Sequence, residues 1–138
     1  MNDRLIGIDF GLSKVGLSIS DPLKIISIPL KVIKYKKKEE LLRKLQEIAM
    51  ENDVKSFVIG YPLNMNNKKN EMTKLVDNFS EDLINLNFNV FLQDERLSSE
   101  SAKKIMREQN IKTGKNKEHI DLISSTIILQ SFLDKGSF

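Results

Sequence analysis

Three carboxylates stand where a folded chain could gather them at one edge of a sheet. Asp9 lies near the end of the apolar run "RLIGIDFG", and Glu95 follows the apolar stretch in "FNVFLQDERL". Asp121 lies in the first turn of a helix predicted over 119–135. Carboxylate oxygens, in a chain without cysteine, are typical ligands of a hard cation such as Mg²⁺ or Mn²⁺. Because such a cation can activate water and offset the charge on a phosphodiester, the trio is a candidate catalytic metal site.

Each acid also has a purely structural interpretation. Asp9 could cap the turn that follows it, as aspartate side chains often do. Glu95 could form an exposed ion pair with Arg96 or a lysine, which contributes little free energy. Asp121 could be a favourable acid at the positive end of a helix dipole. His119 is the single histidine, and we interpret it as an exposed residue at the helix start rather than as a general base.

Hydrophobic periodicity predicts the elements that position these residues. Alternating or continuous apolar runs predict strands over 4–11, 14–20, 24–33, 54–63 and 88–97. Apolar residues at helical spacing, or helix-start signals, predict helices over 37–52, 75–86, 98–110 and 119–135.

The order of these elements predicts an α/β fold. Three strands joined by short turns, then strands linked by helices, indicate a mixed five-stranded sheet: three antiparallel strands, then two parallel ones, flanked by helices. Pro29 places the third strand at the sheet edge, because proline cannot donate to a central ladder. Without an internal repeat or long linker, residues 1–138 are expected to form a single domain. Ligands of open α/β sheets bind beyond the carboxyl ends of the strands, where Asp9 and Glu95 would lie.

Composition restricts the partners and the compartment. The formal net charge of the 138 residues is +3, which permits a polyanionic partner without requiring one. No apolar run reaches the roughly 18 residues that a membrane span needs. Asp3 and Asp9 interrupt any signal-peptide pattern, so we expect a cytoplasmic protein without a membrane contact.

Two lysine-rich stretches could hold phosphates. In "IKTGKNK" (111–117), Lys112, Lys115 and Lys117 precede Asp121 and could contact a nucleic-acid backbone, with strongly salt-dependent binding. A solvated surface loop is the equally weighted alternative. For "KYKKKEE" (34–40), solvated lysines at a helix start are the ordinary interpretation.

Four segments in register resemble a known family. They are "IGIDFGLSKVGLSISDP", "VIGYPLNM", "DERLSS" and "HIDLISSTIILQSFL", and together they span essentially the whole chain. The sequence is similar to the YqgF/RuvX family of the RNase H-like superfamily. The resemblance implies an RNase H-like fold and a nuclease that processes the 5′ end of pre-16S rRNA in ribosome biogenesis. Its implied partners are pre-rRNA or other structured nucleic acid and the pre-ribosomal small subunit, and a Holliday junction resolvase acting on branched DNA is the alternative.

The resemblance also assigns roles. It implies that Asp9, Glu95 and Asp121 are the catalytic and metal-binding acids. Lys14 and Arg96 match basic positions of the family and are expected to offset phosphate charge, and Asn64, in a matching loop near the site, is a further expected contact to nucleic acid.

One departure from the superfamily bears on the metal site. Resolvase and RNase H relatives usually carry an acid at the end of the fourth strand, where this chain reads "IGYPL". The second carboxylate must then come from Glu95, one strand farther out and roughly 10 Å from Asp9 laterally. This spacing favours one cation over two.

Two rival hypotheses come from other classes. The hairpin "GIDFGLSKVG" also resembles the phosphate-binding hairpin of the actin, sugar kinase and Hsp70 superfamily, but those proteins clamp ATP between two such domains. A non-catalytic RNA-binding module would use the lysines alone, yet three carboxylates at one site would repel RNA. The sequence predicts no particular oligomeric state.

Overall fold

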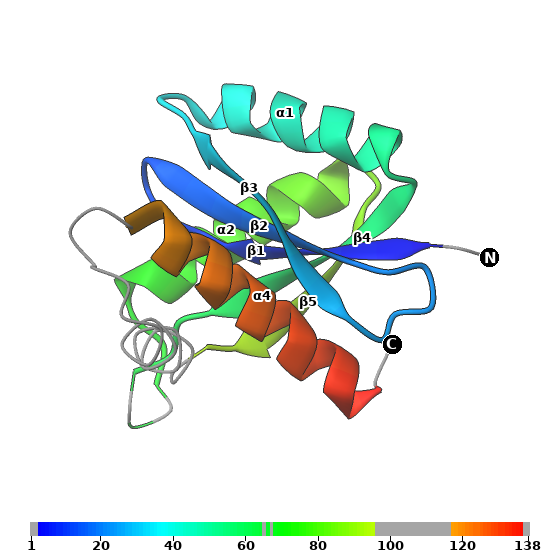
Figure 1. Cartoon of the computed structure of the whole chain (residues 1–138). Helices are drawn as coiled ribbons and strands as arrows, with labels where there is room; N and C mark the ends of the chain where they lie inside the picture. Colours follow the sequence, from blue (N-terminus) through cyan, green and yellow to red (C-terminus); the bar gives the residue numbers. More distant parts are fainter. Residues whose placement is uncertain (1–2, 65, 67, 96–116, 137–138) are drawn as a thin grey trace.

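One five-stranded sheet organises the chain (Figure 1). The computed structural model describes residues 3–64, 66, 68–95 and 117–136, and for 117–119 the backbone alone. The strands are β1 (Arg4–Asp9), β2 (Lys14–Ser20), β3 (Ser27–Lys34), β4 (Val54–Tyr61) and β5 (Asn89–Asp94). Their order across the sheet is β3-β2-β1-β4-β5. β1, β2 and β3 pair antiparallel, whereas β4 pairs parallel with β1 and β5 with β4, so the predicted mixed sheet is confirmed.

Helices cover both faces of the sheet. They are α1 (Lys38–Glu51), α2 (Glu71–Asn85) and α4 (Lys117–Lys135). α1 and α2 lie on one face and α4 crosses the other (Figure 1). Among these described helices, none combines the length and the apolar content needed to cross a membrane.

Each face has its own hydrophobic core. Under α1 and α2 the buried side chains include Ile6, Ile8, Val15, Leu17, Leu41, Leu45, Phe57, Ile59, Val76, Phe79 and Leu83. Under α4 they are Leu5, Val58, Ile128, Leu129, Phe132 and Leu133. Because side chains alternate along a strand, Ile6 and Ile8 of β1 face α1 and α2, and Asp9 faces α4. Strand alternation therefore delivers the carboxylate to the α4 side.

The third strand begins later than predicted, at Ser27 rather than at residue 24. The Asp21 carboxylate accepts hydrogen bonds from the backbone N–H groups of Leu23, Ile25 and Ile26, at 3.2, 2.7 and 2.8 Å. These bonds hold the segment in a turn and keep it out of the ladder. β3 is an edge strand, as Pro29 predicted.

The second helix begins earlier than its apolar pattern indicates, at Glu71 rather than at Leu75. Asn70 and Thr73 form a reciprocal capping box, which satisfies backbone N–H groups at the helix start. β4 and β5 end at Tyr61 and Asp94, before the predicted bounds of 63 and 97. The helix predicted over 98–110 lies outside the described residues.

Candidate active site

Two of the predicted acids meet at the carboxyl ends of the parallel strands. Asp9 is the last residue of β1, and Glu95 directly follows β5. The Glu95 backbone N–H donates to the Tyr61 carbonyl at the end of β4, at 3.2 Å. The side chains of Asp9 and Glu95 share a hydrogen bond. The predicted lateral gap between them is thus closed.

Burial of this pair raises the pKa of both groups. The pKa of Glu95 rises to about 8, mainly through burial and then through the charge of Asp9. The pKa of Asp9 rises to about 6 through burial and the charge of Asp121, although the Glu95 hydrogen bond and Lys14 lower it. At neutral pH, Glu95 therefore keeps its proton and donates it to the ionised Asp9.

Asp121 approaches the site from the first turns of α4. Its Oδ2 lies 2.9 Å from Nζ of Lys14, the first residue of β2. The same oxygen is buried and, within the described part of the chain, has no hydrogen-bond partner, so the contact is ionic only. Lys14 was predicted to face phosphate, and here it neutralises Asp121.

Gly16 sets how closely Asp121 approaches the sheet, and it is a site residue that no sequence motif predicted. A Cβ atom on Gly16 would lie 2.4 Å from the backbone carbonyl oxygen of Asp121. Gly16 pairs with Asp9 across β2 and β1, so the residue opposite the first acid makes room for the third. Its alternation with the larger residues Val15 and Leu17 was the only signal in the sequence.

The same face holds α4 through buried polar contacts. The Ser18 hydroxyl donates to the Ser125 carbonyl at 2.8 Å, and the Ser125 hydroxyl donates to the Gly7 carbonyl at 2.9 Å. A Cβ atom on Gly7 would lie 2.7 Å from Cβ of Leu129. α4 therefore rests almost against the backbone of β1, one turn beyond Asp121.

The donor set fits a hard cation, although its ligands are not assembled. Within the described residues, no group of three or more acidic, histidine or cysteine side chains is arranged to hold a metal ion. The reason is visible in the contacts: Asp9 and Glu95 share a proton, and Lys14 occupies Asp121. A divalent cation would lower the raised pKa values of the pair, and it could replace Lys14 as the partner of Asp121 Oδ2, which accepts no hydrogen bond within the described residues.

The predicted nucleic-acid contacts fall into two groups. Arg96, Lys112 and Lys115 lie outside the described residues, as do the side chains of Lys117 and His119 at the start of α4. Asn64 is exposed, and its side chain accepts a 2.9 Å hydrogen bond from the Lys68 backbone N–H, closing the loop after β4.

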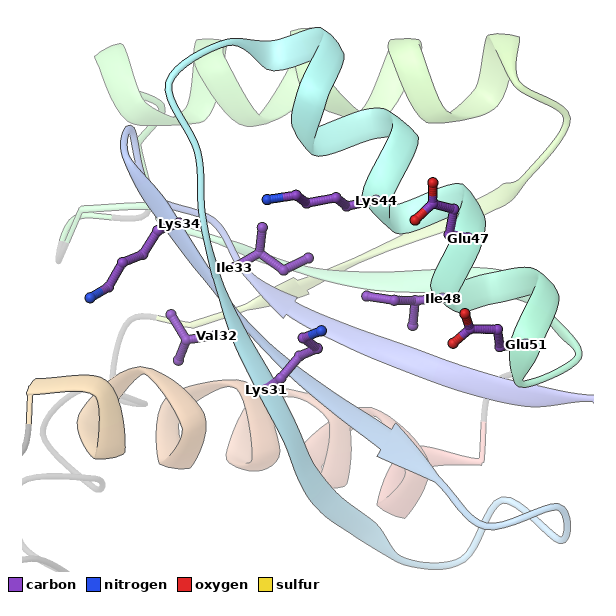
Figure 2. A pocket seen from close by; sticks show the side chains of 8 residues that line it. All are labelled: Lys31, Val32, Ile33, Lys34, Lys44, Glu47, Ile48 and Glu51. Atoms are coloured by element: carbon purple, nitrogen blue, oxygen red, sulfur yellow. The ribbon is translucent and has the colours of Figure 1, made fainter.

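A groove between β3 and α1 lies apart from these acids (Figure 2). It has a volume of about 490 Å³. Lysines 31, 34 and 44 line it together with Glu47 and Glu51, over an apolar floor that includes Ile33 and Ile48. Because its lining carries both signs of charge and none of the three predicted acids, we do not place the active site there.

Comparison with known proteins places the chain in a family. A family model described as "RuvX: Holliday junction resolvase" matches residues 3–135. A relative from Ruminiclostridium cellulolyticum, named "Putative pre-16S rRNA nuclease", is 42% identical over 135 residues, which are 96% of this chain and 94% of the relative.

Solved structures agree on the fold. T. thermophilus RuvC in complex with a Holliday junction substrate superposes with a TM-score of 0.58 at 9% identity, over 98% of this chain and 96% of that one. Fowlpox virus resolvase in complex with Holliday junction DNA gives 0.60 at 10% identity, over 98% and 99%. These likenesses confirm the predicted RNase H-like fold. Together with the family match and the close relative, they show that the chain belongs to the RuvX family of nucleases.

Proposed function

We propose that this protein is a metal-dependent nuclease that hydrolyses phosphodiester bonds of structured RNA, with the 5′ end of pre-16S rRNA as its substrate. The observation that carries the proposal is the Asp9–Glu95 pair, two carboxyl groups with raised pKa values at the carboxyl edge of the sheet. The name of the relative supports the RNA substrate. Such a role implies a cytoplasmic location and contact with the pre-ribosomal small subunit.

All three acids would serve as ligands of the cation. Asp9 and Glu95 would bind Mg²⁺ or Mn²⁺, with Asp121 as the third ligand once Lys14 releases it. When bound, the cation supplies an activated water and offsets the charge on the phosphate. On binding the cation, Glu95 would release to solvent the proton that it otherwise donates to Asp9.

Basic and amide side chains would hold the substrate around this centre. Lys14, once released from Asp121, would pair with a phosphate group of the substrate, whose negative charge would replace that of Asp121. Arg96, Asn64, Lys112, Lys115 and Lys117 are the further proposed contacts to the nucleic-acid backbone, and we expect them to make binding salt-dependent.

A Holliday junction resolvase is the second candidate. The specific observation in its favour is the superposition on two resolvases over nearly the whole chain. At these identities the superposition concerns the fold, so the 42% identical relative weighs more for the substrate.

One assay separates the candidates. A 5′-extended rRNA precursor and a four-way DNA junction are incubated with the protein in Mn²⁺, Mg²⁺ or EDTA. We expect cleavage of the RNA that requires a cation. Cleavage of the junction alone would support the resolvase, and salt-sensitive RNA binding without any cleavage would support the non-catalytic module.

A further inference from the structure

Gly60 lies on the path by which Glu95 reaches Asp9. β4 separates β1 from β5, and Gly60 is the next-to-last residue of β4. A Cβ atom on Gly60 would lie 2.9 Å from Glu95 Oε2 and 3.0 Å from its Cδ. The Glu95 carboxyl group therefore occupies the space that any side chain at position 60 would fill.

The backbone does not explain the glycine. The φ angle of Gly60 is outside the left-handed region, so a residue with a side chain could adopt the same conformation. The space for a side chain is lacking instead. A Cβ atom at position 60 would meet the carboxyl group of Glu95 and, at 2.6 Å, Cδ1 of Ile128. Cδ1 is the end of a flexible chain and can move, whereas the carboxyl group is fixed by its bond to Asp9.

The distance between the strands that carry Asp9 and Glu95 explains why the space over Gly60 must stay open. Two strand spacings put the chains of Asp9 and Glu95 roughly 10 Å apart. Glu95 is anchored at its backbone by the Tyr61 carbonyl and must extend its side chain over β4 toward β1. It passes directly over Gly60.

We propose that Gly60 is a positioning residue that lets Glu95 replace the fourth-strand acid of related nucleases as the second carboxylate beside Asp9. The inference rests on the proposed metal-dependent function, because it concerns the same site. It assigns one cause to two features of the sequence: the glycine near the end of β4 and the glutamate directly after β5. An aspartate at 60 and a glutamate at 95 are alternative solutions that cannot share the space.

The first test measures Mn²⁺ binding by calorimetry and by electron paramagnetic resonance, without substrate. Ile128→Val removes the Cδ1 atom and serves as the background. Adding Gly60→Ala to that background leaves the Glu95 carboxyl group as the close neighbour of the new methyl group. We expect Ile128→Val to bind Mn²⁺ like the wild type, and Ile128→Val with Gly60→Ala to bind about 10–100-fold more weakly, as for the loss of a residue that orients a ligand.

The second test is a rescue. Glu95→Ala vacates the space over β4 and should weaken Mn²⁺ binding at least as much. Adding Gly60→Asp to Glu95→Ala and Ile128→Val places a carboxylate on the strand next to Asp9. We expect this combination to recover Mn²⁺ affinity to within about tenfold of the wild type, a gain that a merely structural role for Gly60 does not predict.

The outcomes separate this inference from the proposed function. If the wild type binds Mn²⁺ and Asp9→Asn does not, the metal site stands. Unchanged affinity with Gly60→Ala, or no recovery with Gly60→Asp, then overturns the role of Gly60. If the wild type itself binds no Mn²⁺, the proposed function fails first. Should Gly60→Ala not fold, as judged by circular dichroism, the rescue variant decides.

Discussion

The two faces of the sheet are built on different principles. The face under α1 and α2 is filled by large apolar side chains, such as Phe57, Phe79 and Leu83, each nearly inaccessible to water. The face under α4 carries small and polar residues instead, with Gly7 and Ser18 in its middle. Its apolar cluster includes Phe132 and Leu133 of α4, and the three acids lie at the ends of β1 and β5 and near the start of α4.

The first face mainly stabilises the fold, and the second face mainly positions the three acids. Large side chains on the first face contribute burial, roughly in proportion to the apolar area removed from water. Small residues on the second face let α4 approach the strand backbone closely, and this brings Asp121 near the other two acids. Mutations on the first face should therefore mainly lower stability, and mutations on the second face should mainly impair metal binding and cleavage.

The largest effect is expected on catalysis, from Asp9→Asn. Loss of this proposed cation ligand should remove several kcal/mol of transition-state stabilisation, so cleavage should slow by about 10²–10³-fold. The free energy of unfolding should not fall, because the substitution removes a buried charge whose pKa is already raised. Single-turnover cleavage and thermal unfolding measure the two quantities.

Asp53→Asn is the matched control for that variant. Asp53 is exposed, with a φ of 55° that asparagine also adopts readily, so neither rate nor stability should change. A large loss of stability in Asp9→Asn would contradict the division between the faces.

On the opposite face, Leu83→Ala should cost stability instead. Leu83 is fully buried between α2 and the sheet, and such a truncation typically costs 2–5 kcal/mol. Mn²⁺ affinity of the folded fraction should stay at the wild-type value. Leu75→Ala, on the exposed side of the same helix, is the control and should cost far less. Denaturant unfolding with and without Mn²⁺ gives both results, and weakened Mn²⁺ binding by Leu83→Ala would show that the faces are coupled.

The sequence predicts the first face better than the second. The strand expected over 14–20 coincides with Lys14–Ser20, because alternation of large and small residues is a local property. The helix expected over 37–52 matches Lys38–Glu51 to within one residue at each end. Large apolar residues are usually buried, so the positions that face this core can be predicted from the sequence alone.

Positioning depends on contacts between distant segments. That Gly60 lies under the Glu95 carboxyl group depends on the register of β4 on β5, in which Gly60 pairs with Gln93. No local sequence pattern predicts this register. The sequence therefore predicts a gap of about 10 Å between Asp9 and Glu95, but not that the Glu95 side chain crosses it. The Lys14–Asp121 ion pair likewise joins residues more than a hundred positions apart.

The acid pair also predicts a pH dependence of stability. The folded protein keeps a proton on Asp9 and Glu95 at pH values where the unfolded chain has released it, so the unfolding free energy should fall as pH rises from about 5 to about 8. Glu95→Gln should flatten this slope. Urea unfolding at pH 5.5 and 8.0 measures it. Asp21, whose pKa is lowered by backbone hydrogen bonds, loses its contribution only in more acidic solution. An equal slope in Glu95→Gln would mean that the pair does not share a proton.

A smaller loss is expected where α4 meets the sheet. Ser125→Ala removes the hydroxyl that donates to the Gly7 carbonyl and contacts the Ser18 hydroxyl, so both buried groups lose a hydrogen-bond partner. The expected cost is about 1–3 kcal/mol. Because Ser125 lies one helical turn from Asp121, Mn²⁺ affinity should weaken as well, unlike in Leu83→Ala. Unfolding and Mn²⁺ titration of this variant show whether the placement of α4 and metal binding are linked. Unchanged Mn²⁺ affinity would mean that Ser125 contributes to stability alone.

The smallest effect is expected at the outer surface of the first face. Lys44 Nζ lies 3.1 Å from Glu40 Oε1 within α1, and both side chains are more than a third exposed. An exposed pair of this spacing contributes about 0.3–0.5 kcal/mol, and salt screens it. Lys44→Met should therefore lower the unfolding free energy by no more than that, and the loss should vanish in high salt. Because Lys44 also lines the groove beside β3, a change in RNA affinity larger than in a Lys74→Met control would show that this face contacts the substrate and would narrow the contrast between the two faces.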